Sequence, residues 1–403
     1  MSIVELESSV LNGKVNIPPS KSAAHRALIC SFLSGGGSVE GIIDSSDMKA
    51  TKGALEALKN GDEVINCIES GSTLRFIIPI AAALGRSVCF TGSGRLPERP
   101  IGEYIRLLEE HGVKCKSNGF LPLKINSQLK AGRFELRGDI SSQYVTGLLL
   151  ALPLLNENSE IVLTSPLQSK PYVDMTVKVL KDYGIEVEET ENGYFIKGSQ
   201  KYKVRDYRVE GDWSQAAFFL AAGAIGGDVT VCSLDMNSAQ GDKRIVDILK
   251  AFGAEIELGN DFVRAKKSAL HGIEIDAKDI PDMVPALSVV AANADGKTVI
   301  KNIQRLRLKE SDRVESIVSN LKKAGAEALA TEDSIIIEGS EISGAELSGF
   351  NDHRIVMAFS VLALTANGKT TISDAQSINK SYPAYFNDYN SLGGRANVID
   401  NRQ

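Results

Sequence analysis

The sequence is poor in the residues that hold metal ions or build disulfide frameworks. Its 403 residues include only four histidines, and their spacing fits no metal site. The five cysteines are odd in number and include no C-x-x-C pair, which argues against a disulfide framework or structural zinc and fits a reducing cytosol. We therefore expect a protein that holds no metal ion.

The sequence also lacks the features that direct a chain to membranes or nucleic acids. The longest uncharged apolar run, around Val145–Leu155, is too short to span a bilayer. Met1–Val10 carries acidic residues where a signal peptide would need basic ones. The formal net charge is -6, and no basic tract offers a nucleic-acid or membrane footprint. These absences predict a cytoplasmic protein without membrane or nucleic-acid partners.

Common cofactor and nucleophile motifs are missing as well. No G-x-x-x-x-G-K-[ST] segment is present, and Gly92-Ser93-Gly94 lacks the third glycine of a dinucleotide-binding fingerprint. No G-x-S-x-G segment marks a nucleophilic serine. ATP and NAD are therefore not expected, and we predict that the protein uses no cofactor.

The chain is, however, long enough for two domains and a cleft. Its 403 residues exceed what one hydrophobic core organises, which favours two domains of about two hundred residues each. With 43% hydrophobic and 24% charged residues, the composition is that of an ordinary globular protein rather than a disordered, collagen-like or coiled-coil chain.

Three local signals recur in the same order along the chain, each of them six times. One is a polar turn that enters a short β-branched strand, and another is a helix that ends in Leu and Gly. The remaining signal is an apolar helix after a polar N-cap residue, at intervals of 50 and then 70 residues four times. The expected caps are Ser22, Ser72, Ser142, Asp212, Asp282 and Asp352.

These signals predict six units of helix, strand, helix, strand and strand, because four of the terminal glycines precede hairpin-like pairs of strands. Six units divide naturally into three plus three. The fourth unit opens at Val209-Glu210-Gly211-Asp212, so we expect the chain to cross between domains there and at the stiff Pro18-Pro19.

Basic residues cluster where these helices are expected to begin, although the whole chain is acidic. Helix N-termini carry partial positive charge, and Arg and Lys are the usual partners of carboxylate and phosphate. A small polyanionic ligand is therefore implied, although a single Ser or Asp is more simply a cap and a charged face can be merely solvated. The bases are Lys21, Arg26, Arg75, Arg95, Arg99, Lys170, Lys309, Arg313, Arg354 and Lys380.

Two carboxylates are candidates for acid-base chemistry. Asp282 precedes an apolar helix, and Glu310 lies between Lys309 and Arg313. Neighbouring cations normally lower the pKa of a carboxyl group, which suits a base or an electrostatic role better than a resting acid. A structural ion pair is an equally good interpretation from the sequence alone.

Nine motifs, taken together and in this order, closely resemble the EPSP synthases of the enolpyruvyl transferase family. The resemblance covers essentially the whole chain, and the nine motifs together are far more specific than any one of them. The motifs are Pro18-Pro19-Ser20-Lys21-Ser22 with Arg26, Gly71-Ser72-Thr73-Leu74-Arg75, Arg95-Leu96-Pro97-Glu98-Arg99-Pro100-Ile101, Ser141-Ser142-Gln143, Ser169-Lys170-Pro171-Tyr172, Ile280-Pro281-Asp282, Leu308-Lys309-Glu310-Ser311-Asp312-Arg313, Asn351-Asp352-His353-Arg354 and Lys380-Ser381-Tyr382-Pro383.

The resemblance implies an inside-out α/β barrel fold in which each of two domains has three βαβαββ units. One domain would combine residues 1–18 with 211–403, the other would span 19–210, and the active site would lie in the cleft between them. The strand region Ile3–Val15 would then pair with residues after about 210. A monomer without a metal ion or cofactor is also implied.

The resemblance further implies the substrates, the reaction and the residues. The enolpyruvyl group of phosphoenolpyruvate would pass to the 5-hydroxyl of shikimate 3-phosphate by addition and elimination, with Asp282 taking the hydroxyl proton and Glu310, with Lys21 nearby, managing the methylene proton. Shikimate 3-phosphate would contact Lys21, Ser22, Arg26, Ser141, Ser142, Gln143, Ser169, Tyr172, Asp282 and Lys309. Phosphoenolpyruvate would contact Lys21, Gly71, Ser72, Arg99, Gln143, Arg313, Arg354 and Lys380. Glyphosate would compete with phosphoenolpyruvate.

The sequence departs from the family pattern at Glu69 and Arg305, where many relatives have Asn, and at Phe76, which replaces a frequent Pro. Two alternatives stay open. An enolpyruvyl transferase that acts on UDP-N-acetylglucosamine would place a reactive Cys in a mobile loop, and the corresponding Arg95–Pro100 loop has none. A non-catalytic binder of phosphorylated metabolites would need the bases but neither Asp282 nor Glu310.

Overall fold

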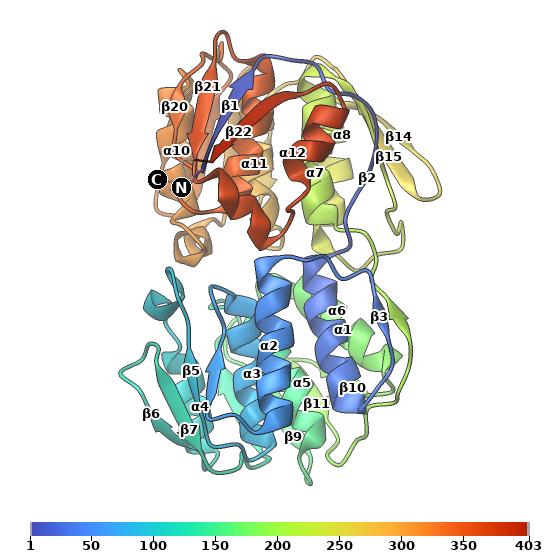
Figure 1. The fold of residues 1–403 in the computed structure, drawn as a ribbon, viewed down its shortest axis with the longest axis vertical. Helices are drawn as coiled ribbons and strands as arrows, with labels where there is room; N and C mark the ends of the chain where they lie inside the picture. The colour runs from blue at the N-terminus through green and yellow to red at the C-terminus, as the bar shows by residue number, and fades with distance from the viewer. Residues whose placement is uncertain (1, 401–403) are drawn as a thin grey trace. The chain divides into compact units, whose positions relative to one another are not determined.

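The structure is a computed structural model that describes residues 2–400, and it divides into two compact units. Unit 1 combines Met1–Ser20 with Glu210–Gln403, and unit 2 spans Lys21–Val209. The crossings expected at Pro18-Pro19 and at Val209–Asp212 lie next to these boundaries. The chain thus leaves unit 1 after its first strands and returns to it for its second half (Figure 1).

Unit 1 contains three sheets of four strands each, in the orders β14-β15-β13-β2, β16-β17-β19-β18 and β20-β21-β1-β22. Its strands are β1 (Ser2–Glu7), β2 (Asn12–Asn16), β13 (Asp228–Cys232), β14 (Glu255–Leu258), β15 (Phe262–Lys266), β16 (Glu274–Asp276), β17 (Lys297–Lys301), β18 (Glu327–Ala330), β19 (Ser334–Glu338), β20 (Glu346–Leu347), β21 (Thr370–Ser373) and β22 (Arg395–Asp400). Its helices are α7 (Trp213–Gly226), α8 (Ile245–Ala251), α9 (Val284–Ala292), α10 (Arg313–Lys323), α11 (His353–Leu362) and α12 (Tyr385–Ser391).

Unit 2 contains two four-stranded sheets, β4-β5-β7-β6 and β10-β11-β9-β8, and the two-stranded sheet β12-β3. Its strands are β3 (Val39–Glu40), β4 (Val64–Asn66), β5 (Val88–Thr91), β6 (Lys114–Lys116), β7 (Leu123–Asn126), β8 (Arg133–Leu136), β9 (Ser159–Leu163), β10 (Val187–Thr190), β11 (Gly193–Ile196) and β12 (Tyr207–Arg208). Its helices are α1 (Lys21–Ser34), α2 (Ser46–Asn60), α3 (Gly71–Ala83), α4 (Gly102–Glu110), α5 (Ser142–Ala151) and α6 (Lys170–Asp182).

The expected repeat is present in both units. In four of the five four-stranded sheets, two strands joined through a helix run parallel, as β16 and β17 do through α9. In the remaining sheet the parallel strands are β2 and β13, and the chain between them forms unit 2. An antiparallel pair completes each sheet, as β18 and β19 do beside β17. The four expected hairpins follow α4, α6, α8 and α10. The glycines that end the repeats adopt left-handed φ angles, for example 77° at Gly61 and 99° at Gly253, which explains why Gly closes these helices.

The first strands of the chain complete sheets of its second half. β1 pairs antiparallel with both β21 and β22, and β2 pairs parallel with β13. In Figure 1 these two blue strands lie among the late elements of unit 1. The two crossing segments meet where Ser20 N donates to Glu210 O at 2.7 Å and Asp212 N donates to Pro18 O at 2.9 Å. This pairing is the one that the resemblance implies.

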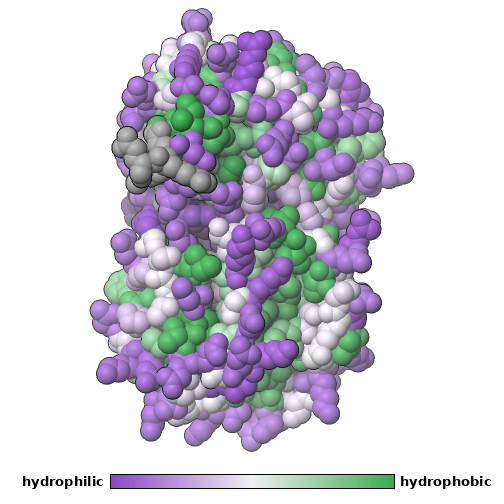
Figure 2. Space-filling view, viewed as in Figure 1, coloured by the Kyte–Doolittle hydropathy of each residue, from purple (hydrophilic) through white to green (hydrophobic). Residues whose placement is uncertain are grey.

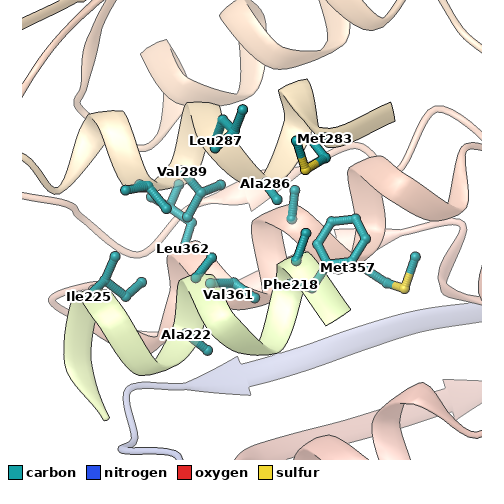
Figure 3. Packing of buried hydrophobic residues seen from close by; sticks show 14 of the residues in the cluster. Phe218, Ala222, Ile225, Met283, Ala286, Leu287, Val289, Met357, Val361 and Leu362 are labelled. Carbon is teal, nitrogen blue, oxygen red and sulfur yellow. The ribbon is translucent and has the colours of Figure 1, made fainter. Parts of the chain in front are cut away.

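Almost wholly buried helices form the centre of each unit. In unit 1, α7, α9 and α11 pack together, and Phe218, Ala222, Leu287, Met357 and Val361 belong to one buried hydrophobic cluster (Figure 3). A helix that is apolar on all sides must be surrounded by protein, so the strands are left to cover the outside. In unit 2, α3 and α5 have the same character.

The N-cap predictions are confirmed at two of the six helices. Asp212 accepts a hydrogen bond from Gln215 N, and Asp352 accepts one from Arg354 N, each at 3.0 Å. Both residues have the extended backbone typical of a cap.

The cap predictions at Ser22, Ser72, Ser142 and Asp282 are wrong by one or more positions. Ser70 caps α3 and Ser141 caps α5, so Ser72 and Ser142 lie within the first helical turn. Ser22 lies in the first turn of α1, and Asp282 lies in a 3₁₀ helix that precedes α9. Neighbouring serines are chemically equivalent as caps, so spacing alone cannot choose between them.

Figure 2 shows hydrophilic residues over most of the visible face, with hydrophobic residues in smaller groups. Within residues 2–400, no helix is long and apolar enough to cross a membrane.

Candidate active site

The expected site residues of unit 2 gather at the amino ends of its buried helices. Lys21 is the first residue of α1, and its ammonium donates to the Asp47 carboxylate in the first turn of α2 at 2.7 Å. Both side chains are largely buried, at 12% and 13% exposure. The pair therefore fixes the position of a cation that could face an anionic ligand.

A second group joins the amino ends of α3 and α5. The Gln143 amide donates to Ser72 Oγ at 3.0 Å and accepts from Arg75 Nη1 at 3.2 Å. Arg99 lies against the same turn, because a Cβ built on Gly71 would meet Arg99 Nη1 at 2.4 Å. The absence of a side chain at Gly71 thus leaves room for two guanidinium groups beside a helix N-terminus.

Arg26 has a different environment from the other bases. It is buried, with its guanidinium donating to Ser22 O at 2.6 Å, to Tyr172 O at 2.9 Å and to Thr176 Oγ1 at 2.8 Å. Burial lowers the pKa of this guanidinium to about 10, so it stays charged at neutral pH. Arg26 therefore ties the start of α1 to the start of α6.

The expected serines stand at helix starts. Ser141 Oγ accepts from Gln143 N at 3.2 Å, and Ser142 begins α5. Ser169 precedes α6 in a left-handed conformation with φ of 57°, which is uncommon for a residue with a side chain. Lys170 pairs instead with Asp174 and Glu189 at a more exposed place.

In unit 1, Arg313 holds three carboxylates together. Its guanidinium donates to Asp282 at 2.8 Å, to Glu310 at 2.7 Å and to Asp352 at 2.8 Å, and its side chain is only 1% exposed. Burial by itself would lower the pKa of Arg313, but Asp352, Glu310 and Asp282 raise it above its ordinary value. Glu310 thus lies beside a base in space as well as in the sequence.

Asp282 contacts three cationic side chains of unit 1. Besides Arg313, it accepts from Arg354 at 3.0 Å and lies 3.4 Å from Lys309 Nζ. Burial lowers the pKa of Lys309, Asp282 counteracts this, and Arg313 adds to the lowering. The arrangement supplies both an oxygen that can accept a proton and positive charge for an anion.

Lys380 is held by an unusual backbone. Phe350 and Asn351 have left-handed φ angles of 51° and 50°, and the Asn351 carbonyl accepts from Lys380 Nζ at 2.6 Å. Such conformations cost energy for residues with side chains and collect at functional sites. The turn leads directly into the Asp352 cap of α11.

Three residues near these groups were not assigned a site role from the sequence. Asp47 binds Lys21, and Arg75 binds Gln143. Of these residues, the sequence indicates only Arg75, as one of the clustered bases. Asp242 is fully buried and accepts a short hydrogen bond from Ser214 Oγ. Burial raises the pKa of Asp242 to about 6, Asp282 adds to the rise, and Arg354 opposes it. An acidic residue in the first turn of a helix is a signal that could have identified Asp47.

Glu69, Arg305 and Phe76, the three residues that depart from the family pattern, each lie against an identified neighbour. Glu69 lies against Gly94, where a Cβ would meet the carboxylate at 2.6 Å. Arg305 donates to Lys278 O at 2.7 Å. Phe76 is buried in α3, with the Arg26 guanidinium 5.2 Å from the centre of its ring.

The chain matches the family model described as EPSP synthase (3-phosphoshikimate 1-carboxyvinyltransferase) over residues 7–64 and 59–389. It is 43% identical to the 3-phosphoshikimate 1-carboxyvinyltransferase of Clostridium novyi, with 99% of each chain covered. It is 44% identical to the protein of the same name from Clostridium acetobutylicum, with 98% of each chain covered.

Solved structures agree. The EPSP synthase of Acinetobacter baumannii superposes with a TM-score of 0.81 and 26% identity, covering 99% of this chain and 100% of that one. The enolpyruvyl transferase NikO of Streptomyces tendae shares the fold, with a TM-score of 0.79 at 16% identity and 99% of each chain covered. These likenesses confirm the expected fold class. By its family model and its relatives, this chain is an enzyme that belongs to the EPSP synthase (3-phosphoshikimate 1-carboxyvinyltransferase) family.

Proposed function

We propose that the polar helix ends of both units act in one reaction, the transfer of the enolpyruvyl group of phosphoenolpyruvate to the 5-hydroxyl of shikimate 3-phosphate. The reaction releases inorganic phosphate. The observation that carries the assignment of residues is the buried cluster in which Asp282 accepts from Arg313 and Arg354. A carboxylate and several cations in one place suit a hydroxyl substrate that must lose a proton next to an anion.

For shikimate 3-phosphate, we assign the helix starts that carry hydroxyl groups and the cations beside them. Arg26 supports this assignment because it ties the backbone of Ser22 to that of Tyr172. Helix N–H groups and serine hydroxyls can orient phosphate oxygens, and lysine can supply the charge. The proposed contacts are Lys21, Ser22, Arg26, Ser141, Ser142, Gln143, Ser169, Tyr172, Asp282 and Lys309.

For phosphoenolpyruvate, we assign the amino end of α3 and the cations of unit 1. The guanidinium of Arg313 already makes hydrogen bonds to three carboxylates, so we expect it to exchange one of these partners when the anionic substrate binds. The proposed contacts are Lys21, Gly71, Ser72, Arg99, Gln143, Arg313, Arg354 and Lys380.

We assign the proton transfers of this reaction to Glu310, Lys21 and Asp282. Glu310 and Lys21 together manage the proton that the methylene carbon of phosphoenolpyruvate gains, and the neighbouring carbon gains cationic character. The 5-hydroxyl attacks that carbon while Asp282 takes the hydroxyl proton. The intermediate then loses phosphate, which takes the hydroxyl proton from Asp282, and one proton of the new methyl group returns to the group that supplied it, which restores the enol ether. The fixed cations balance the negative charge of both substrates.

The test is release of phosphate by the purified protein with both substrates present, first for the wild type and then for Asp282→Asn. We expect this variant to lose at least about a hundredfold in turnover, because an amide cannot accept the proton. Its binding of shikimate 3-phosphate should stay within about tenfold of wild type.

Asp276→Asn is the matched control, because Asp276 lies at the end of β16 and binds Asn302 and the backbone of Lys278 instead. Near-normal turnover by Asp282→Asn, with only its stability reduced, would contradict the proposal. A wild type that binds both substrates and releases no phosphate would favour a non-catalytic binder.

We also propose that the enzyme works as a monomer in the cytoplasm. All five cysteines have free thiols, which fits a reducing compartment. Light scattering of the purified protein should give the mass of one chain, 43.3 kDa, and twice this mass would contradict the monomer.

A further inference from the structure

A buried line of four side chains runs beneath the amino ends of α1, α2 and α3. His25 Nδ1 lies 2.7 Å from Thr51 Oγ1, Thr51 Oγ1 lies 2.7 Å from Thr73 Oγ1, and Thr73 Oγ1 donates to Ser70 Oγ at 2.8 Å. None of the four is more than 2% exposed. We call these residues the His25 relay.

The protons of the relay can be assigned by counting them. The single hydroxyl proton of Thr73 goes to Ser70, so Thr51 must donate to Thr73. Thr51 has then used its own proton, so His25 must donate from Nδ1 to Thr51. His25 is therefore present with its proton on Nδ1, and every bond in the relay points toward Ser70.

The surroundings of His25 agree with a neutral ring. Burial lowers its pKa well below the ordinary value, and the charges of Lys21 and Arg26 lower it further. Among the described residues, Nε2 has no hydrogen-bond partner, and the ring stands edge-on to Phe76 at 6.2 Å between centroids. A neutral ring with its proton on Nδ1 makes the single hydrogen bond that the relay needs.

The relay ends at a strained turn. Ser70 caps α3 and also accepts from Thr73 N at 3.2 Å. Two residues earlier, Ile68 has a left-handed φ of 53°, which is a clear outlier for a β-branched residue. Its N–H binds Asn66 and its carbonyl accepts from Ser93 N at 2.6 Å. Such a conformation persists only where several contacts hold it in place.

We infer that the His25 relay sets the position of the Gly71-Ser72 end of α3, and that His25, Thr51 and Thr73 are positioning residues for phosphoenolpyruvate. This inference rests on the proposed role of Gly71 and Ser72. The relay ends at Ser70 and acts on Gly71 and Ser72 through this cap, which directly precedes them. Loss of the relay should weaken the binding of phosphoenolpyruvate more than that of shikimate 3-phosphate, because the turn is then held by fewer contacts.

Unit 2 offers a matched control of the same chemistry. Thr146 Oγ1 and Thr176 Oγ1 lie 2.9 Å apart, are fully buried and hold the guanidinium of Arg26. Through Arg26, this second threonine pair supports Ser22 and Tyr172, which we assigned to the binding of shikimate 3-phosphate. The two pairs therefore allow a double comparison within one unit.

The experiment compares Thr51→Val, which keeps the shape but removes the hydroxyl, with Thr51→Ser, which keeps the hydroxyl. We expect Thr51→Val to raise KM for phosphoenolpyruvate by about tenfold with little change in the Kd of shikimate 3-phosphate. Thr51→Ser should stay close to wild type. Thr176→Val should show the opposite selectivity, although all three variants can lose some thermal stability.

Equal KM values for phosphoenolpyruvate in Thr51→Val and Thr51→Ser would overturn the inference. An equal loss of affinity for both substrates in Thr51→Val would also overturn the inference, since a merely structural residue would affect both substrates alike. If Thr51→Val does not fold, ¹⁵N NMR of His25 in the wild type still decides: a proton on Nε2 instead of Nδ1 would overturn the relay. A wild type without enolpyruvyl transfer would contradict the proposed function but leave the NMR test intact.

Discussion

At the scale of single residues, burial raises the pKa of the Asp242 carboxyl group. Asp242 lies in the 3₁₀ helix Gly241–Arg244 and accepts from Ser214 Oγ inside unit 1. Its pKa rises from 3.8 to about 6, chiefly through burial. Between these values the folded protein therefore holds a proton that the unfolded chain releases, and the stability contributed by Asp242 falls as the pH rises through this window.

We predict that Asp242→Asn is more stable than wild type at pH 8, by up to about 3 kcal/mol, since a tenfold change in proton affinity corresponds to about 1.4 kcal/mol. The amide stays neutral and can still accept from Ser214. Near pH 4 the difference should largely vanish, because Asp242 is then protonated in the wild type. Urea unfolding at the two pH values measures the free energies.

Asp228→Asn is the control with the opposite sign. Arg264 binds the exposed Asp228 carboxylate and lowers its pKa, so its contribution to stability is present at neutral pH and lost as the pH falls. Removing this charge should therefore destabilise the protein more at pH 8 than in acid. A pH-independent effect of Asp242→Asn would contradict the first prediction.

At the scale of elements, the amino end of α3 combines a cap, a strained residue and a glycine on which two guanidinium groups converge. A Cβ at Gly71 would meet Arg99 Nη1 at 2.4 Å and Arg75 Nη1 at 2.8 Å. A methyl group there must displace flexible side chains rather than backbone. The helix itself can accept alanine, so the effect of a substitution should appear in ligand binding.

We predict that wild type is sensitive to glyphosate and that Gly71→Ala raises the inhibition constant of glyphosate more than it raises KM for phosphoenolpyruvate. The added methyl group removes space that only the longer ligand needs, while displacement of Arg99 affects both ligands. Competitive inhibition kinetics on both proteins measures the two constants.

Gly53→Ala is the matched control, since Gly53 lies on the exposed side of α2 and a Cβ there meets nothing within 4 Å. Alanine favours a helix over glycine, so this variant should be slightly more stable with unchanged constants. The prediction would be contradicted if Gly71→Ala changed the inhibition constant of glyphosate and KM for phosphoenolpyruvate equally. A wild type that millimolar glyphosate does not inhibit would contradict it as well.

At the scale of the whole molecule, the proposed contacts of shikimate 3-phosphate belong to both units. Lys21, Ser142 and Tyr172 are in unit 2, whereas Asp282 and Lys309 are in unit 1. A ligand that binds one arrangement of the units better than others shifts the population toward it. We predict that shikimate 3-phosphate alone makes the protein more compact, as a smaller radius of gyration in X-ray scattering.

Phosphoenolpyruvate alone is the comparison ligand, and ordered binding with shikimate 3-phosphate first should accompany the compaction. An unchanged radius of gyration at saturating shikimate 3-phosphate would count against the prediction. Domain closure would also exclude water from the reacting enol, which is why the order of binding bears on catalysis.

Most of the repeat architecture could be predicted from the sequence because its signals are local. A left-handed glycine such as Gly61, a β-branched strand such as β17 and a cap such as Asp212 each depend on residues only a few positions apart. The caps of α3 and α5 could not be predicted to the residue, since the nearby serines Ser70 and Ser72, or Ser141 and Ser142, offer the same oxygen.

The sequence by itself indicated the repeated order of helices and strands, the crossings of the chain near residues 20 and 210, and a set of clustered bases. Only the tertiary structure decided which groups meet. Asp47 binds Lys21, Asp352 binds Arg313, and Thr51 joins His25 to Thr73 across three helices. These contacts depend on helix packing and burial, because an ion pair or hydrogen bond between distant residues leaves no periodic mark in the chain.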